Sequence, residues 1–552
     1  GQRAAQAVGA LLILAVLALG GDVRVLALIL VAIGVAWTFQ VHFLRPHYLE
    51  RFRTILRGDR DRAEIALPEL DMNALETLMS ALNSADDFEV MSALDLFVSS
   101  DRAHLIPALI LHHPAKDVVL RALDIFAAAG REDHLPITKR LIRRRDPEIR
   151  AAAVRASRDD GLVARALADP APLVIGTALV QLLGKGQALG VDANAQIEAL
   201  VSEGDVSARM GLARAIAQHR TLQPGTEALL VRLGTQEAPA VMAEAAVAMR
   251  AFPRPAFVHP LIGMLTYRVP RAAARQALLA MGATVVAELA DALSDPNVDF
   301  GIRVHLPATL RAFDDPRVPS ILMGRLLEEP SGMIRFKILR ALRHMRKDDP
   351  ALALDQAGLH EATQRTLVAC YTLLDWQYIL RDGQEAHASP GHELLSTLVQ
   401  DKLTHSVDRL FRLLDLVHPT EDFGEIYRGL NSTVSENQGS SLELVENLVD
   451  MRWRDAVVGL VAPDAATQTR EERLASGAAF YTSTTSDYEV LLNRVIHTPS
   501  TTLQAVAAYH VGELGLFGLR PALEAIETEA YGALAEVVVN AIERLDRQGE
   551  AR

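Results

Sequence analysis

The feature that most constrains this chain is a pair of apolar stretches within Val8–Phe43. The first, Val8–Leu19, and the second, Val25–Phe39, contain no charged residue. With its small flanking residues, each approaches the roughly 20 residues that a helix needs to cross about 30 Å of hydrocarbon. A helix also satisfies its own backbone hydrogen bonds in lipid. We therefore predict a transmembrane helical hairpin in residues 1–44, with a short turn at Gly20–Arg24.

Two other interpretations of these stretches are less favoured. A secretory signal peptide has one apolar core and a small-residue cleavage site, whereas here two apolar runs follow each other and the second leads into a basic stretch. A buried hairpin of a soluble domain is the other alternative, and the near-absence of polar residues argues against it.

The segment after the hairpin is rich in arginine, which predicts the orientation in the membrane. By the positive-inside rule, both ends of the hairpin lie in the cytoplasm. Residues 45–65 are predicted to form a basic juxtamembrane helix and linker. Its candidate contacts for anionic lipid headgroups are Arg45, Arg51, Arg53 and Arg57. A solvated connector without lipid contacts is an equally good interpretation.

The chain begins with Gly1, and the apolar runs follow almost at once. We expect the hairpin to be the last two helices of a larger membrane domain, so that the chain is the C-terminal part of a longer protein. Removal of the first residues is the alternative. The expected location is a cellular membrane, with the remaining chain in the cytoplasm.

Composition excludes several classes of protein. The net charge of −13 argues against general nucleic-acid binding, which requires a basic surface. Hydrophobic residues make up 50% of the chain but aromatic residues only 5%, with Ala and Leu dominant, which favours small-residue packing of helices. Cys370 is the single cysteine, so neither a disulfide framework nor a thiolate metal cluster is expected.

Beyond residue 65, a motif recurs in which an acidic or proline-marked turn precedes a helix with apolar residues at helical spacing. The instances are Asp86–Phe97, Lys116–Phe126, Asp146–Ala156, Asp169–Leu182, Gly204–Ile216, Ala238–Met249, Arg268–Gly282, Asp295–Phe313 and Pro330–Leu342. The period of about 25–35 residues is typical of an array of stacked units.

A second predicted helix lies between successive motif helices and carries an early proline, which the first helical turn tolerates. The examples are His104–His113, His134–Arg144, Phe257–Tyr267 and Val318–Glu329. One such unit cannot bury its apolar face alone, whereas stacked units share a continuous core. The fold class expected for the chain is therefore all-α, a transmembrane hairpin followed by an α-solenoid.

The turn and helix DPEIRAAA, from Asp146 to Ala153, resembles the HEAT repeats of the short bacterial type. This resemblance implies HEAT-like repeats over residues 66–350. One relative of these repeats is a bilin lyase, which would make the chain an enzyme. We disfavour that role because a membrane hairpin is not expected there.

The whole layout resembles a second group. Arg409–Leu430 and Ser440–Asp450 follow the basic helix and the repeats. This order is similar to the C-terminal half of bacterial proteins related to the ATP/ADP translocases of the major facilitator superfamily, which carry HEAT repeats and often a cyclic-nucleotide-binding domain. The remaining transmembrane helices and that last domain are missing here, so no substrate-binding residue is carried over and transport by this chain alone is not implied.

The second half is predicted to continue the solenoid, and two lobes joined near Ala351–Gly391 are the alternative. Residues 351–450 form an elaborated helical region, and residues 451–552 return to HEAT-like repeats. A long helix is expected at His392–Val417, a helix capped by Thr420 after it, and a loop at Asn431–Gly439.

Candidate sites are weak. His112 and His113 are adjacent and point about 100° apart on a helix, so a turn is favoured over a metal site. Cys370 lies among apolar residues and is expected to be inert. Two basic clusters could receive phosphate or an acidic partner, but solvated helix ends are favoured. The clusters are Arg143–Arg145 and the set Arg340, Arg343, Arg346 and Lys347.

These patterns indicate no catalytic residues, no cofactor and no bound metal, so the chain is not expected to be an enzyme. The predicted function is a membrane-anchored HEAT-repeat scaffold, or the regulatory cytoplasmic arm of a transporter-like protein, that acts through membrane lipid and protein partners. A missing upstream transporter domain would be one partner. The alternative is a self-contained scaffold with a two-helix anchor, and the bilin-lyase-like role comes third.

Overall fold

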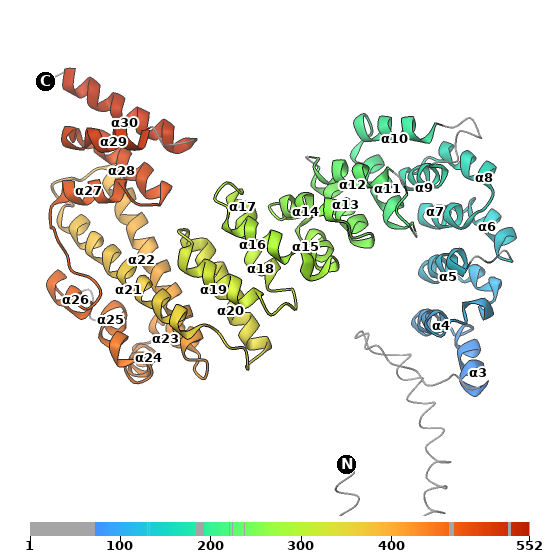
Figure 1. The fold of residues 1–552 in the computed structure, drawn as a ribbon, viewed down its shortest axis with the longest axis horizontal. Coiled ribbons are helices and arrows are strands. Elements are labelled where there is room, and N and C mark those ends of the chain that lie inside the picture. The colour runs from blue at the N-terminus through green and yellow to red at the C-terminus, as the bar shows by residue number, and fades with distance from the viewer. Residues whose placement is uncertain are drawn as a thin grey trace, which may run out of the picture. The chain divides into compact units, whose positions relative to one another are not determined.

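The computed structural model describes residues 72–129, 131, 133–183, 192–219, 221–223, 225–236, 238–462, 468–527 and 532–550. These residues form α-helices and short 3₁₀-helices and no β-strand, so the predicted all-α class is confirmed (Figure 1). The predicted hairpin of residues 1–44, the linker of residues 45–65 and the candidate lipid contacts Arg45, Arg51, Arg53 and Arg57 lie outside the described residues.

Among the described helices, none alone combines the length and the apolar composition needed to cross a bilayer. Two neighbouring segments, Arg271–Ala280 and Gly282–Ser294, meet that requirement only when they are counted together, and they meet at a bend of 115°.

The chain divides into two compact units, the first ending at Thr226 and the second beginning at Glu227. The helices of the first unit are α3 (Met72–Ala81), α4 (Asp87–Ser99), η1 (Ala103–Leu105), η2 (Ala108–His112), α5 (Lys116–Ala129), α6 (Leu135–Leu141), α7 (Pro147–Ala156), α8 (Asp160–Arg165), η3 (Ala166–Ala168), α9 (Pro172–Leu182), α10 (Ala193–Ser202) and α11 (Val206–Ala217). Helices α4, α5, α7, α9 and α11 pack in succession as one row, while α6, α8 and α10 pack against that row.

The second unit is larger. Its first helices are α12 (Thr226–Gly234), α13 (Pro239–Ala251), η5 (Pro255–Phe257), α14 (Val258–Met264), α15 (Arg271–Ala280), η6 (Gly282–Val285), α16 (Val286–Ser294), α17 (Phe300–Arg303), α18 (Leu306–Leu310), α19 (Val318–Glu328) and α20 (Gly332–Asp348). The remainder are α21 (Gln356–Asp382), α22 (Pro390–Val417), α23 (Phe423–Leu430), α24 (Ser435–Leu448), α25 (Met451–Val461), α26 (Arg470–Ser476), α27 (Tyr488–Ile496), α28 (Thr501–Leu514), η8 (Phe517–Leu519), α29 (Arg520–Glu527) and α30 (Ala533–Glu550).

Two rows of helices run through the second unit. Helices α18, α20, α22, α28 and α30 pack in succession, and α16, α19, α21, α27 and α29 form the other row. Helices α23 to α26 form a side layer, in which α23 contacts α22 while α25 and α26 contact α21. This stacking of helix pairs is consistent with a helical-repeat solenoid. The domain boundaries predicted from the sequence stay a prediction.

The acidic residue of the repeated turn caps the helix that follows it. The carboxylates of Asp86, Asp146 and Asp205 accept hydrogen bonds from backbone N–H groups of the first helical turn, at 3.0, 2.8 and 2.7 Å. The first N–H groups of a helix have no partner within the helix, so these caps define where each helix begins.

A recurring arginine ties consecutive helices together. Arg150, Arg271 and Arg335 each donate hydrogen bonds, between 2.7 and 3.0 Å, to carbonyl oxygens at or just beyond the end of the preceding helix. These carbonyl groups lack partners within the helix and lie at its negative end, so a guanidinium stabilises them. This contact explains the arginine of the repeated motif.

Small residues allow α9 and α11 to approach closely. A Cβ atom on Gly211 would lie 2.7 Å from the carbonyl carbon of Pro172, and one on Gly176 would lie 3.0 Å from the carbonyl oxygen of Gly211. Any side chain at these crossing points would push the helices apart. The small-residue packing expected from composition is therefore confirmed at this crossing.

Two predictions around α23 and α24 were wrong. Asp422, and not Thr420, caps α23, because its carboxylate accepts a hydrogen bond from the N–H of Glu425 at 2.9 Å. The predicted loop Asn431–Gly439 ends early, since α24 begins at Ser435 and carries an acidic residue in its first turn, which favours a helix start.

Two predicted helices are broken by proline. The segment His104–His113 forms two 3₁₀-helices separated around Pro107, and Asp295–Phe313 contains the short helices α17 and α18 with Pro307 at the start of the second. Proline lacks an N–H group and clashes with the preceding turn, so each helix restarts there.

Candidate binding surface

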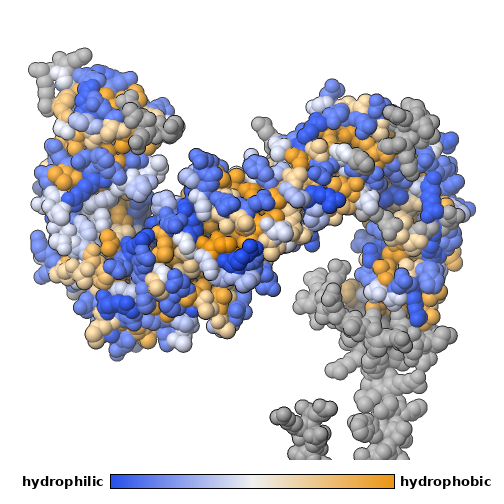
Figure 2. Space-filling model, viewed as in Figure 1, coloured by the Kyte–Doolittle hydropathy of each residue, from blue (hydrophilic) through white to orange (hydrophobic). Residues whose placement is uncertain are grey.

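A set of cations lies along α15, α18, α20 and α22 of the second unit. All of them are half-buried. We call this set the basic row, and its members are Arg275, Arg311, Arg335, Lys337, Lys402 and Arg409. Figure 2 shows hydrophilic residues over much of the visible face of each unit, with smaller hydrophobic areas between them.

At the end of the basic row formed by α15 and α18, the hydrogen-bond partner of Arg275 is an uncharged hydroxyl group. The Nε of Arg275 donates a hydrogen bond to the Oγ1 of Thr309 at 3.2 Å. Burial lowers the pKa of Arg275, and the charges of Arg271 and Arg311 act in the same direction. The electrostatic surroundings of this guanidinium are therefore positive.

Lys337 of α20 extends this positive region. Burial lowers the pKa of His305, and the charges of Arg271, Lys337 and Arg275 lower it further. Because His305 immediately precedes α18, the positive field reaches across α15, α18 and α20.

At the other end of the basic row, Arg409 of α22 lies against the start of α20. A Cβ atom on Gly332 would lie 3.0 Å from its Nη1, and its Nη2 donates to the Oγ of Ser406 at 2.6 Å. Burial lowers the pKa of Arg409 to about 10, helped by the charge of Arg335. Burial and the charge of Arg409 also lower the pKa of Lys402.

Most carboxylates near the basic row already have partners. Asp408 accepts from Arg412 at 3.0 Å, and Asp348, which is 73% exposed, lies 3.4 Å from Arg311. In the described part of the chain, four members of the basic row form no hydrogen bond with a backbone carbonyl group, namely Arg275, Lys337, Lys402 and Arg409. Among the described residues, no carboxylate forms an ion pair with any of these four.

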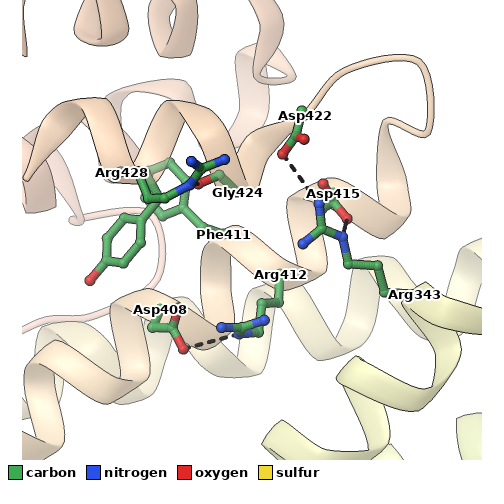
Figure 3. A pocket seen from close by; sticks show the side chains of 9 residues that line it. Arg343, Asp408, Phe411, Arg412, Asp415, Asp422, Gly424 and Arg428 are labelled. Carbon is green, nitrogen blue, oxygen red and sulfur yellow. Dashed lines mark hydrogen bonds and ion pairs between the residues drawn. The ribbon is translucent and has the colours of Figure 1, made fainter. Parts of the chain in front are cut away.

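A small pocket lies beside the basic row, between α20, α22 and α23 (Figure 3). Its volume is about 180 Å³. Arg343 points toward two carboxylates, with its Nε 2.7 Å from Asp415 and its Nη2 3.2 Å from Asp422. Arg412, on the opposite side, pairs with Asp408.

This pocket serves packing better than it serves ligand binding. Its volume is below the roughly 300–1,000 Å³ of typical small-molecule sites. Burial raises the pKa of Asp415 even though Arg343 is adjacent. Carboxylates within the pocket already neutralise the charges of Arg343 and Arg412. The pocket is therefore a polar contact between three helices.

The basic cluster predicted at the end of α20 is divided by the structure. Arg340 and Lys347 are exposed, as expected for a solvated helix end. Arg343 instead forms the ion pairs of the pocket, and Arg346 donates to the carbonyl oxygens of Leu416 and Leu352. Arg143–Arg145 are exposed, in agreement with a solvated helix end.

The other candidate residues, Cys370 and His113, have structural roles. Cys370 is fully buried, and burial raises the pKa of its thiol to about 12, as expected for an inert residue. His113 belongs to a turn, where its Nδ1 accepts from the N–H of Ala115 at 3.2 Å. In the part of the chain that the structure describes, no three His, Cys, Asp or Glu side chains are grouped to hold a metal ion.

Sequence reasoning missed the basic row because its members are scattered over four helices, with at most two on each helix. A local signal was nevertheless present. None of Arg275, Lys337, Lys402 and Arg409 has an Asp or Glu three or four positions away in the sequence. On a helix those are the positions from which a carboxylate would neutralise the cation.

Comparison with known proteins adds no assignment. No protein-family description matches the chain, and no curated protein is significantly similar to it.

Proposed function

We propose that this protein is a helical-repeat scaffold that acts by binding other proteins, with the basic row as its contact surface. The observation that carries this proposal is the set of half-buried cations without carboxylate partners in a chain whose net charge is −13. A poorly solvated charge without a carboxylate partner lowers the stability of the fold. A bound partner would supply the missing contacts.

The HEAT-like motif and the layout of the chain support a finer form of this proposal. In that form the solenoid is the cytoplasmic arm of a transporter-like protein of the bacterial inner membrane, tethered by the hairpin predicted for residues 1–44. A self-contained scaffold with a two-helix anchor is the alternative. The mass of the native protein in its own membranes separates the two, because the anchor predicts a band near 60.0 kDa and the arm predicts a larger one.

Site-specific photo-crosslinking in cells tests the contact surface. A crosslinking residue replaces Lys337 on α20 and, in a matched control, the exposed Gln364 on α21, which belongs to the other helix row. We expect a discrete crosslinked species from position 337 and none from position 364. Crosslinks from neither position, or equally from both, would contradict the proposal.

A further inference from the structure

We infer that the partner bound by the basic row is an acidic polypeptide segment, rich in Asp and Glu, of another protein. This inference rests on the proposed function, since it names the chemistry of the partner that the scaffold would bind.

The hydrogen-bonding capacity of the basic row supports this assignment. A guanidinium carries five N–H donors. Among the described residues, Arg409 uses its donors only for Ser406, and Arg275 only for Thr309. Lys337 contacts the ring of Phe336, with its Nζ 5.8 Å from the ring centroid. Carboxylates accept two such donors in a bidentate pair, so Asp and Glu side chains fit the unused groups.

The depth of these cations favours side chains over a membrane surface. All members of the basic row are half-buried, and Arg275 and Arg409 lie at contacts between helices, whereas arginines that contact lipid headgroups must project toward a broad surface. Side chains of an extended peptide reach into such recesses individually. A lipid bilayer is therefore the less suitable occupant.

Nucleic acid is also a poor fit. Single strands bind where bases stack on exposed aromatic rings beside cations. Phe336, which lies between Arg335 and Lys337 on α20, is covered by the guanidinium of Arg412, whose Cζ lies 4.4 Å from the ring centroid. The net charge of −13 further opposes a polyanion that would cover more than this local surface.

The spacing of the helices that carry the basic row predicts the length of the acidic segment. Neighbouring packed helices lie about 8–10 Å apart, so the steps from α15 to α22 span on the order of 25–30 Å. An extended chain covers roughly 3.3 Å per residue, which corresponds to about nine residues. We expect acidic residues at intervals of about three positions along this segment.

The test uses the full chain in a non-ionic detergent and a fluorescent Glu-rich peptide of about nine residues, with the matching Gln peptide as control. Fluorescence anisotropy measures binding at low and at moderate salt. The Glu peptide should bind, more weakly as salt rises, and the Gln peptide should not. The double variant Lys337→Gln and Arg409→Met should bind roughly tenfold more weakly for each cation removed.

Two controls keep the test decisive. Arg365→Gln on α21 removes the same charge from an exposed arginine that pairs with Glu361, and it should leave affinity within about twofold of the wild type. The single variant Lys337→Gln removes no hydrogen bond of the described structure, and it should weaken binding even where the double variant fails to fold.

Equal binding by the wild type and Lys337→Gln would overturn the inference. So would binding through the basic row of anionic lipid vesicles or of oligothymidylate in place of the peptide. A crosslinked partner at position 337 without binding of the Glu peptide would leave the scaffold function standing and reject the acidic partner.

Discussion

The two units stack helices in the same way, but the second unit, beside several buried ion pairs, also carries the basic row. In the first unit, cations of the helix row meet carboxylates of the neighbouring helix or turn. Arg121 pairs with Asp95 at 2.6 Å, and Arg155 pairs with Asp124 at 2.5 Å. In the second unit, Arg409 instead meets a hydroxyl group.

This difference separates charges that hold the fold from charges that do not. Arg150 of the first unit joins two helices through Asp169 and two carbonyl groups, with both ion-pair oxygens 2.8 Å away. Arg275 of the second unit has a single neutral partner and two cationic neighbours. The first kind stabilises the repeat, whereas the second kind is the kind of charge that the proposed partner would neutralise.

The largest effect is expected from breaking a paired cation of the first unit. Arg150 and Asp169 are each 13% exposed, so Arg150→Met leaves a poorly solvated carboxylate and costs about 3 kcal/mol. Hydrogen exchange of α7 and α9 measures the loss. The exposed Arg145→Met is the matched control, and an equal response to both substitutions would contradict this role.

Protonation of His219, whose surroundings include the charge of Arg155, provides a second test of the first unit. Burial lowers the pKa of His219 to about 4 from its ordinary 6.5, and the charge of Arg155 acts in the same direction. The folded state therefore binds this proton less readily than the unfolded state, and stability is lost as pH falls from about 6.5 toward 4.

Between pH 7 and pH 5, this residue should remove on the order of 2 kcal/mol from the stability of the first unit. Hydrogen exchange at the two pH values, corrected for the intrinsic rate, measures the change in α11. His219→Gln should abolish this contribution. A pH dependence that survives the substitution would assign the effect to other groups.

The opposite sign is expected in the second unit. Arg409→Met replaces a guanidinium in a positive environment with an apolar side chain of similar length, which should be neutral or stabilising by about 1 kcal/mol. Chemical denaturation followed by hydrogen exchange in α20 and α22 measures this gain. A loss comparable with that of Arg150→Met would show that Arg409 holds the fold.

The smallest expected effect is that of salt. Raising ionic strength screens the repulsion within the basic row, so protection of α20 and α22 should increase by a few tenths of a kcal/mol. Protection of α5 and α7, which depends on attraction, should decrease by a similar amount. Parallel changes in the two units would remove the electrostatic distinction between them.

The helical rows were predictable because their signals are local. Asp86, Asp146 and Asp205 mark helix starts through bonds to residues two or three positions away, and apolar spacing marks the buried faces. Asp422 shows the limit of this approach, since Thr420 is also of a residue type that favours the N-cap, and only the folded backbone places the carboxylate of Asp422 on the N–H of Glu425.

The basic row was not predictable in the same way. Arg275, Lys337 and Arg409 are far apart in the sequence, and only the stacking of α15, α18, α20 and α22 gathers them. The contiguous run around Arg343 was more conspicuous, yet Asp415 and Asp422 neutralise Arg343 from other helices. Tertiary packing therefore determines which cations have carboxylate partners and which do not.

Residue-resolved labelling of arginines with phenylglyoxal tests the central claim most directly. The reagent attacks guanidinium groups, and mass spectrometry of the full chain gives the rate at each arginine. We predict that Arg275 and Arg409 react several times faster than Arg150, and that the Glu-rich peptide protects the first two but not the third. Equal rates without protection would contradict the claim that the basic row is an open site for an acidic partner.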